Sequence, residues 1–192
     1  MSQLFIKNIE KYFILSQEEK EIILGLTQIQ KLHKKHFLLK EGDICKSSAF
    51  VLSGCIRSYF VDSNGFEHIL QFAIEDWWIT DMMSITNQTA ANLNIDAIAD
   101  SELLILTREN QLEMFDKCPK MEKYFRIITE KGMANIQTRL LENMSLSAIE
   151  RYKNLIKKYP IIIEKLPQKQ IASFLGITPE FLSKLRHQLA YE

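Results

Sequence analysis

A short stretch near the end of the sequence, QKQIASFLGITPEFLSKLRHQL, carries the side chains best suited to contacting a nucleic acid. A second helical pattern begins after Gly176, and at 100° per residue Glu180, Ser183, Lys184 and His187 fall on one side of it. These groups donate and accept hydrogen bonds of the kind that base edges offer. The pattern therefore predicts a helix whose polar face fits the major groove of DNA.

Two short helices joined at Gly176 are needed to hold this face, because a tight turn there can require a positive φ. Thr178 is a good N-cap and Pro179 suits the first helical position, so the second helix is expected to begin here. The apolar residues are spaced to face inward: Ile171, Ala172, Leu175, Leu182, Leu185 and Leu189. An ordinary helical hairpin with a polar outside has the same spacing and stays the alternative to a helix-turn-helix.

Different roles are expected within a helix-turn-helix. Lys184 could donate to guanine, Glu180 could accept from cytosine N4, and Ser183 could do either. Lys169 and Arg186 lie nearer the edges and are expected at phosphates. The full set of expected DNA-contacting residues is Gln168, Lys169, Thr178, Pro179, Glu180, Ser183, Lys184, Arg186 and His187.

The charge of the chain is zero overall but unevenly distributed. Residues 1–117 hold 11 Lys and Arg against 17 Asp and Glu, whereas residues 151–192 hold 8 against 3. A basic tail behind an acidic front favours a polyanion as the partner of the tail.

Residues 31–106 have a sequence pattern typical of an antiparallel β structure. Short apolar runs alternate with turn signals, as in DSNG between the strand-like runs 56–61 and 68–73, which favours a barrel or sandwich. Helical patterns flank this region, and capping boxes at Ser16 and Ser147 mark two helix starts.

A long helix is predicted over residues 118–144, with an apolar stripe that is too hydrophobic to leave in water. Gly132 within the stripe lowers helix propensity, and a close approach of two helix backbones would offset this cost. We therefore expect a dimer along the stripe, part of which could pack on its own β domain. The stripe comprises Met121, Phe125, Ile128, Gly132, Ile136 and Leu140.

Several classes of protein are disfavoured. No apolar run approaches the length of a membrane span, and no signal peptide is recognisable, which predicts a cytoplasmic protein. The three cysteines are scattered, so neither a disulfide framework nor a zinc site is expected. No catalytic triad or nucleotide-binding loop occurs, and we expect no enzyme. His33 and His36 with Glu41 leave a cupin-like metal site as a weak alternative.

Taken in order, these segments resemble the bacterial Crp/Fnr family of transcription regulators. LLKEGD, FVLSGCIRSYF and DAIADSELLIL are similar to strands of its cyclic-nucleotide-binding-type β-roll. KMEKYFRIITEKGMANIQTRLLENM stands where the family has its dimer helix, and QKQIASFLGITPEFLSKLRHQL resembles its DNA-binding motif. The resemblance implies a dimeric regulator that binds a palindromic DNA site, with RNA polymerase and a small-molecule effector as further partners.

Departures from the family pattern concern the effector and the DNA-binding domain. Thr80-Asp81 stands where cyclic-AMP-binding members have Gly-Glu, and the later segment has no arginine, so cyclic AMP is not expected. An apolar effector pocket is an alternative to plain core for this region, formed by Trp78, Thr80, Asp81, Met82, Met83 and Ser84. The sequence stops at Glu192, so the β-hairpin wing that usually follows the recognition helix is not expected.

The predicted fold class is α+β. We expect a jelly-roll-like antiparallel β-roll with flanking helices over residues 1–117, a dimerisation helix over 118–144, and a helix-turn-helix domain without a full wing over 145–192. A β-roll sensor that acts through protein contacts, without binding DNA, stays the alternative function.

Overall fold

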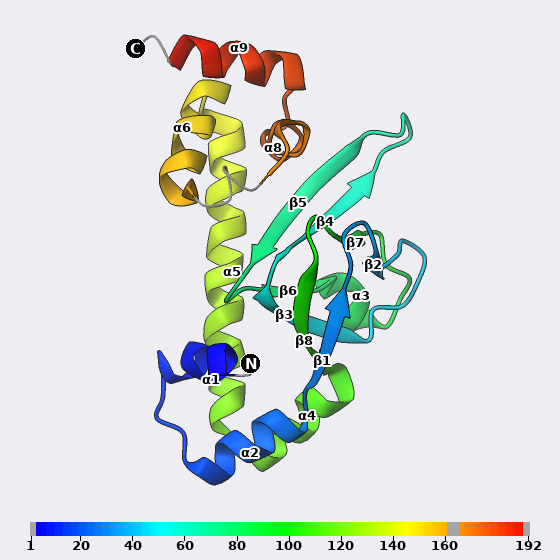
Figure 1. Cartoon of the computed structure of the whole chain (residues 1–192), viewed down its shortest axis with the longest axis vertical. Coiled ribbons are helices and arrows are strands. Elements are labelled where there is room, and N and C mark those ends of the chain that lie inside the picture. The colour runs from blue at the N-terminus through cyan, green and yellow to red at the C-terminus, as the bar shows by residue number, and fades with distance from the viewer. Residues whose placement is uncertain (1–2, 161–165, 190–192) are drawn as a thin grey trace. The chain divides into compact units, whose positions relative to one another are not determined.

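The computed structural model describes residues 3–160 and 166–189, and it divides into two compact units (Figure 1). The first unit comprises residues 1–60 and 70–129, and the second comprises residues 61–69 and 130–192. This grouping differs from the three domains expected, because the long helix is shared between the units and a hairpin segment, residues 61–69, belongs to the second unit.

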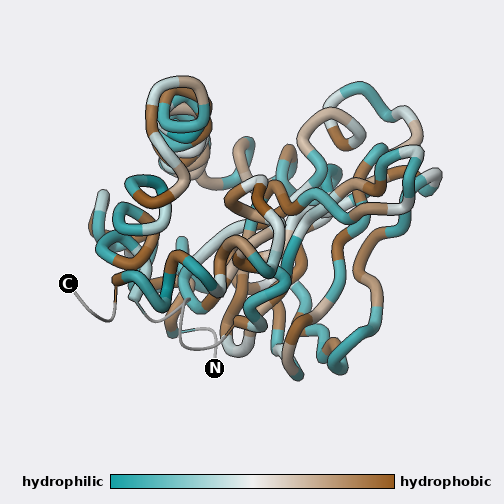
Figure 2. The backbone as a smooth tube through the Cα atoms, turned by 90° about the horizontal axis from the view of Figure 1, so that it is seen from above, coloured by the Kyte–Doolittle hydropathy of each residue, from teal (hydrophilic) through white to brown (hydrophobic). Residues whose placement is uncertain are grey.

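Eight strands form two antiparallel four-stranded sheets, ordered β1-β8-β3-β6 and β2-β7-β4-β5, which confirms the predicted β-roll. Hydrophobic and hydrophilic residues are both found along the strands of this region (Figure 2). The strands are β1 (Gln28–Leu32), β2 (Phe37–Leu39), β3 (Ser47–Ser53), β4 (Cys55–Val61), β5 (Glu67–Ile74), β6 (Trp78–Ile79), β7 (Asn94–Ala97) and β8 (Ser101–Thr107).

The helices begin where the sequence places good caps. Ser16 and Ser147 each accept from the backbone N–H three residues on, while Glu19 and Glu150 accept from the cap N–H, so both capping boxes are confirmed. The helices are α1 (Gln3–Glu10), α2 (Gln17–Gly25), α3 (Met82–Asn87), α4 (Arg108–Lys117), α5 (Lys120–Ser145), α6 (Ala148–Lys158), α8 (Gln168–Leu175) and α9 (Pro179–Leu189). No described helix is long and apolar enough to cross a membrane.

The first unit has two apolar cores. One lies between the sheets and includes Val51, Ile56 and Ile95. The other covers the outer face of the β1-β8-β3-β6 sheet, where Phe50 packs on Phe5 of α1 in a cluster that also includes residues of α4 and the first part of α5. Because β3 and β8 contribute apolar residues to both cores, their sequences are nearly continuous hydrophobic runs.

The motif SGCIR within β3 and β4 is explained by close packing. Gly54 has a φ of +96°, and a Cβ there would overlap the side chain of Ser101 and the carbonyl of Asp100. Arg57 then forms a bidentate pair with Asp96 of β7, with Nε–Oδ1 and Nη2–Oδ2 distances of 2.8 and 3.0 Å. The motif therefore holds the second sheet together.

Candidate nucleic-acid interface

Helices α8 and α9 form the bend that the sequence predicts. Gly176 ends α8 in the left-handed conformation with φ of +67°, and its N–H reaches the carbonyls of Ala172 and Ser173. The N–H of Ile177 also bonds the Ala172 carbonyl at 3.0 Å. A residue with a Cβ would be strained at Gly176 although space is free around it, so the backbone conformation selects glycine here.

The second helix of the pair begins at Pro179, as expected. The Thr178 hydroxyl accepts a hydrogen bond from the N–H of Phe181 at 3.2 Å, which satisfies one of the free donors of the first turn. Leu182 and Leu185 are buried, and so are Ile171, Ala172 and Leu175 of α8, which contacts both α6 and α9. The arrangement is a helix-turn-helix.

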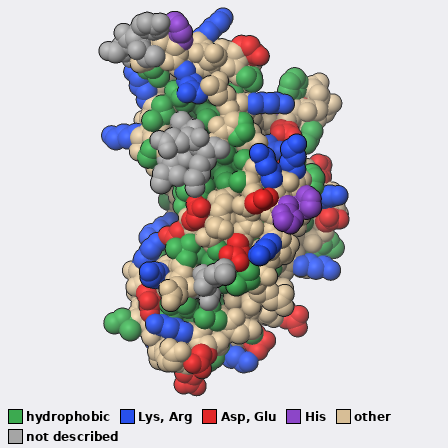
Figure 3. Space-filling view, viewed as in Figure 1, with side chains coloured by type: hydrophobic (Ala, Val, Ile, Leu, Met, Phe, Trp, Pro, Cys, Tyr) green, Lys and Arg blue, Asp and Glu red, His purple; other side chains and the backbone are tan. Residues whose placement is uncertain are grey.

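The outward face of this helix pair is largely polar and exposed. Lys169, Lys184 and Arg186 make no ion pair with any residue in the described ranges. Basic side chains and a histidine are visible near the C-terminus in Figure 3. All nine expected DNA-contacting residues are exposed: Gln168, Lys169, Thr178, Pro179, Glu180, Ser183, Lys184, Arg186 and His187.

Glu180 is fixed in its ionised form at the start of α9. Its own backbone N–H and the hydroxyl of Thr178 lower the pKa of Glu180 below the ordinary range of a glutamate. An ionised carboxylate only accepts hydrogen bonds, so Glu180 suits an amino group such as cytosine N4. Lys184, one turn further on, only donates. The face thus presents an acceptor and a donor with distinct preferences.

The opposite side of α8 is held by contacts that the sequence did not reveal. The Ser173 hydroxyl donates to the carbonyl of Glu67 and accepts from the N–H of Ile69. Arg139 of α5 donates to the carbonyls of Ile69 and Phe174 at 3.0 and 2.9 Å, with its guanidinium 3.9 Å from the Phe174 ring centre. All these residues belong to the second unit.

Burial lowers the pKa of Arg139 from its ordinary value, but an arginine remains charged at neutral pH. A charged donor strengthens both bonds to the carbonyls. The hairpin segment and α5 therefore fix α8 from the side that faces away from α9. Only a pattern of long-range contacts could have identified Arg139 and Ser173, since neither belongs to a local motif.

Most of the residues expected to line an effector pocket have packing or capping roles in the described structure. Trp78 packs in the outer core, with its ring 5.4 Å from Phe50, and its indole N–H donates to Tyr124 Oη. Met82 and Met83 are 56% and 65% exposed. Trp78 is thus part of the core, which was the alternative to a pocket. The two methionines point to solvent.

The three polar members of that set have structural roles. Buried Asp81 is the N-cap of α3 and accepts from the N–H of Ser84 at 3.0 Å. The Ser84 hydroxyl accepts from the N–H of Cys45 and donates to the carbonyl of Thr89. Thr80 donates to the carbonyl of Ser47 at 3.3 Å. The helix start at α3 thus already holds a carboxylate, which disfavours a phosphate there.

The predicted dimer stripe divides between the two units. Met121 is fully buried in the core of the first unit, so its expected role in a dimer is wrong. Phe125 and Ile128 are half-buried against that core. Ile136 and Leu140 are exposed, and Gly132 has open space around it. The reason is that the first turns of α5 pack their apolar side on the outer sheet, so that the apolar stripe is exposed only in the later turns.

An exposed apolar stripe does occur on the second part of α5. Its members follow one another at spacings of three and four residues and therefore share one side of the helix. They are Met133, Ile136, Leu140 and Met144, with Leu141 beside them, and all are more than half exposed.

The histidines that suggested a metal site do not form one. The rings of His33 and His36 are 5.8 Å apart, and His33 Nδ1 lies 3.6 Å from Asp100. Across residues 3–160 and 166–189, no three His, Cys, Asp or Glu side chains are grouped to hold a metal ion.

Known proteins share this architecture. Residues 29–118 match the cyclic nucleotide-binding domain family. The chain superposes on FixK2 from Bradyrhizobium japonicum with a TM-score of 0.74 and 17% identity, covering 86% of this chain and 85% of that one. None of the curated proteins matches the chain.

Two further solved structures extend the comparison. The catabolite activator protein of Thermus thermophilus has a TM-score of 0.59 and 20% identity, covering 96% of this chain and 87% of that one. A transcriptional regulator of the Crp/Fnr family from Eubacterium rectale has a TM-score of 0.68 and 17% identity, covering 92% of this chain and 84% of that one. The likeness establishes the fold over most of the chain.

Proposed function

Because residues 29–118 belong to the cyclic nucleotide-binding domain family and the chain has the Crp/Fnr fold, we propose that it is a DNA-binding transcription regulator. We further propose that it binds a palindromic site as a homodimer. The resemblance seen in the sequence is thereby confirmed for the fold.

The observation that carries this proposal is the helix-turn-helix with an exposed polar face on α9. Leu182 and Leu185 anchor the helix through one side, which leaves Glu180 and Lys184 exposed on the other. In the major groove, an ammonium can donate to guanine O6 or N7, and a carboxylate can accept from cytosine N4. Lys169 of α8 is suited to a phosphate contact.

The exposed stripe of α5 supports a dimer. Met133, Ile136, Leu140 and Met144 form a helical seam of the kind that pairs with a second helix. Two-fold pairing would present two recognition helices about 34 Å apart, which is one turn of DNA. A dimer of this kind requires an operator with two inverted half-sites.

In vitro selection from a random DNA pool tests the proposal directly. We expect an enriched inverted repeat, which is then measured by fluorescence anisotropy at several salt concentrations. Binding should weaken linearly on a logarithmic plot, with a slope of about −0.9 for each phosphate contact. Selection that enriches no sequence, together with binding that salt does not affect, would instead favour a sensor that acts through protein contacts.

A further inference from the structure

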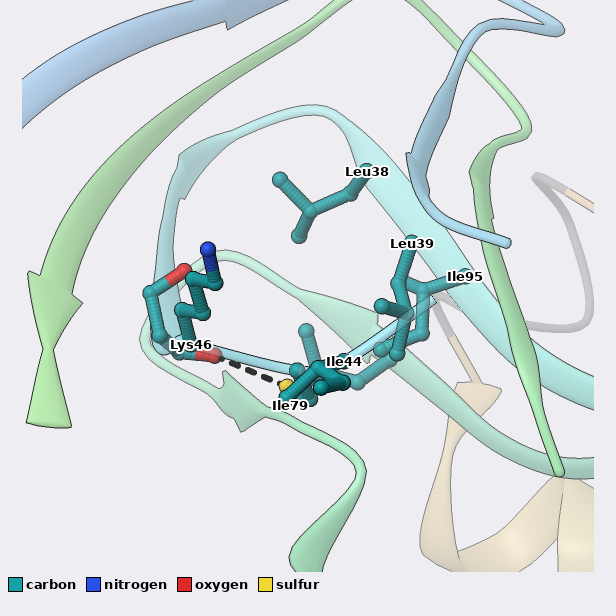
Figure 4. A pocket seen from close by; sticks show the side chains of 8 residues that line it. Leu38, Leu39, Ile44, Lys46, Ile79 and Ile95 are labelled. Atoms are coloured by element: carbon teal, nitrogen blue, oxygen red, sulfur yellow. Dashed lines mark hydrogen bonds between the residues drawn. The ribbon is translucent and has the colours of Figure 1, made fainter. Parts of the chain in front are cut away.

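A cavity of about 170 Å³ lies in the first unit, beside β2 and the loop that leads into β3. In Figure 4, Lys46 borders one side of this space, and Leu39 and Ile95 border the other. The residues expected for an effector pocket are not among those that line it, which are Leu38, Leu39, Ile44, Cys45, Lys46, Ser47, Ile79 and Ile95.

Five of the eight residues that line this cavity have aliphatic side chains, and the thiol of Cys45 is already engaged. Cys45 Sγ donates to the carbonyl of Ser47 at 3.3 Å and lies 3.5 Å from Thr80 Oγ1. The ammonium of Lys46, in contrast, makes no hydrogen bond or ion pair with any residue that the structure describes. The cavity therefore combines aliphatic side chains with one exposed ammonium that forms no ion pair with a described residue.

The size of the cavity limits what it can hold. An apolar protein cavity of about 150 Å³ binds benzene, whereas sites for larger cofactors and drug-sized ligands begin at about 300 Å³. The volume of about 170 Å³ thus fits a single ring or a short branched chain and is too small to enclose a nucleotide. The free ammonium favours an anionic group on such a ligand.

We propose that this cavity binds a small apolar monocarboxylic acid. Its hydrocarbon part would contact Leu38, Ile44 and Ile79, and its carboxylate would pair with the Lys46 ammonium at the edge. The binding itself is independent of DNA. The role of this acid as the effector of the regulator rests on the proposed function.

Calorimetric titration of the full chain, without DNA, tests the binding step. Benzoate and isovalerate are the probes, and benzamide and benzyl alcohol are neutral controls of similar size to benzoate. We expect saturable binding of both acids and clearly weaker binding of the neutral compounds. Lys46→Gln should weaken benzoate binding about three- to fivefold, because an exposed ion pair is partly screened by water and salt.

Two further variants separate this site from other causes. Lys40→Gln removes an exposed lysine that does not line the cavity, and it should leave binding unchanged. Ile44→Trp, at a half-exposed wall position, should fill the space and abolish binding. The proposal is overturned if neither acid binds at millimolar concentration, if benzamide binds as tightly as benzoate, or if Lys46→Gln or Ile44→Trp binds like the wild type.

Anisotropy on the selected operator, with and without benzoate, is a separate readout. A protein that binds benzoate but no DNA refutes the proposed function and leaves the acid site intact. A protein that binds DNA but no acid refutes only the acid site.

Discussion

Ile136→Glu should separate the chain into monomers, and the structure gives the size of the effect. Ile136 is 71% exposed on the second part of α5. Full burial of an isoleucine contributes about 1.5–3 kcal/mol, so burial of this exposed share contributes about 1–2 kcal/mol. A two-fold interface buries both copies, which makes the loss about 2–4 kcal/mol per dimer.

This loss corresponds to a roughly 30- to 700-fold weaker dimer, since each 1.4 kcal/mol is about a factor of ten. Repulsion between two glutamates near the axis would add to it. Sedimentation equilibrium measures the dimer constant, and anisotropy on full and half sites measures the consequence. Palindrome binding should fall far more than binding to a single half-site.

Matched variants distinguish the interface from a general effect of charge. Thr138→Glu introduces the same charge on another side of α5, and Ile14→Glu replaces an isoleucine outside the stripe that is 88% exposed. Neither should affect the dimer. A Cβ at Gly132 would meet no neighbour within 4 Å, so Gly132→Leu should stabilise the protomer through helix propensity by about 1 kcal/mol while weakening the dimer. A wild-type protein that is monomeric at micromolar concentration would refute the reasoning.

Three further outcomes are expected. Lys184→Ala should weaken binding to the preferred DNA site by about 1–3 kcal/mol and relax the base preference. Lys169→Ala should weaken binding to all DNA sequences alike and reduce the salt slope by about 0.9. Equal effects on all sequences from both variants would contradict the assigned roles. Calorimetry with millimolar cyclic AMP should show no saturable heat, because Asp81 already caps α3, and micromolar binding would refute this. Gly54→Ala should destabilise the protein by roughly 1–3 kcal/mol or more in urea unfolding, since its Cβ would overlap Ser101, and an unchanged midpoint would disprove the packing argument.

Local signals in the sequence predicted much of the fold. The capping boxes at Ser16 and Ser147 and the bend at Gly176 depend on residues within four positions of one another. Such signals act through backbone hydrogen bonds and allowed φ values, so they can be recognised without knowing how the rest of the chain folds. The turn in DSNG is also local, with Asp62 accepting from the N–H groups of Asn64 and Phe66.

Contacts between distant segments could not be predicted in this way. Asp96 pairs with Arg57 only because β4 and β7 are neighbours in one sheet. Met121 continues the periodic stripe of α5, yet it is buried by its own unit, because periodicity shows which residues share a side but not what covers that side. The same reason explains why Trp78 proved to be core.

Stability and base preference depend on different residues of α9, and this separation limits what the fold can reveal. Leu182 and Leu185 are buried, so their size and shape are constrained by the neighbouring helix. Glu180, Ser183 and Lys184 are exposed, and changes at exposed positions typically alter stability by less than about 0.5 kcal/mol. The fold is therefore compatible with many combinations of residues on this face. The base sequence of the operator therefore depends on side chains that the fold does not constrain. For this reason, selection from random DNA tests the proposed function more sharply than any further comparison of folds.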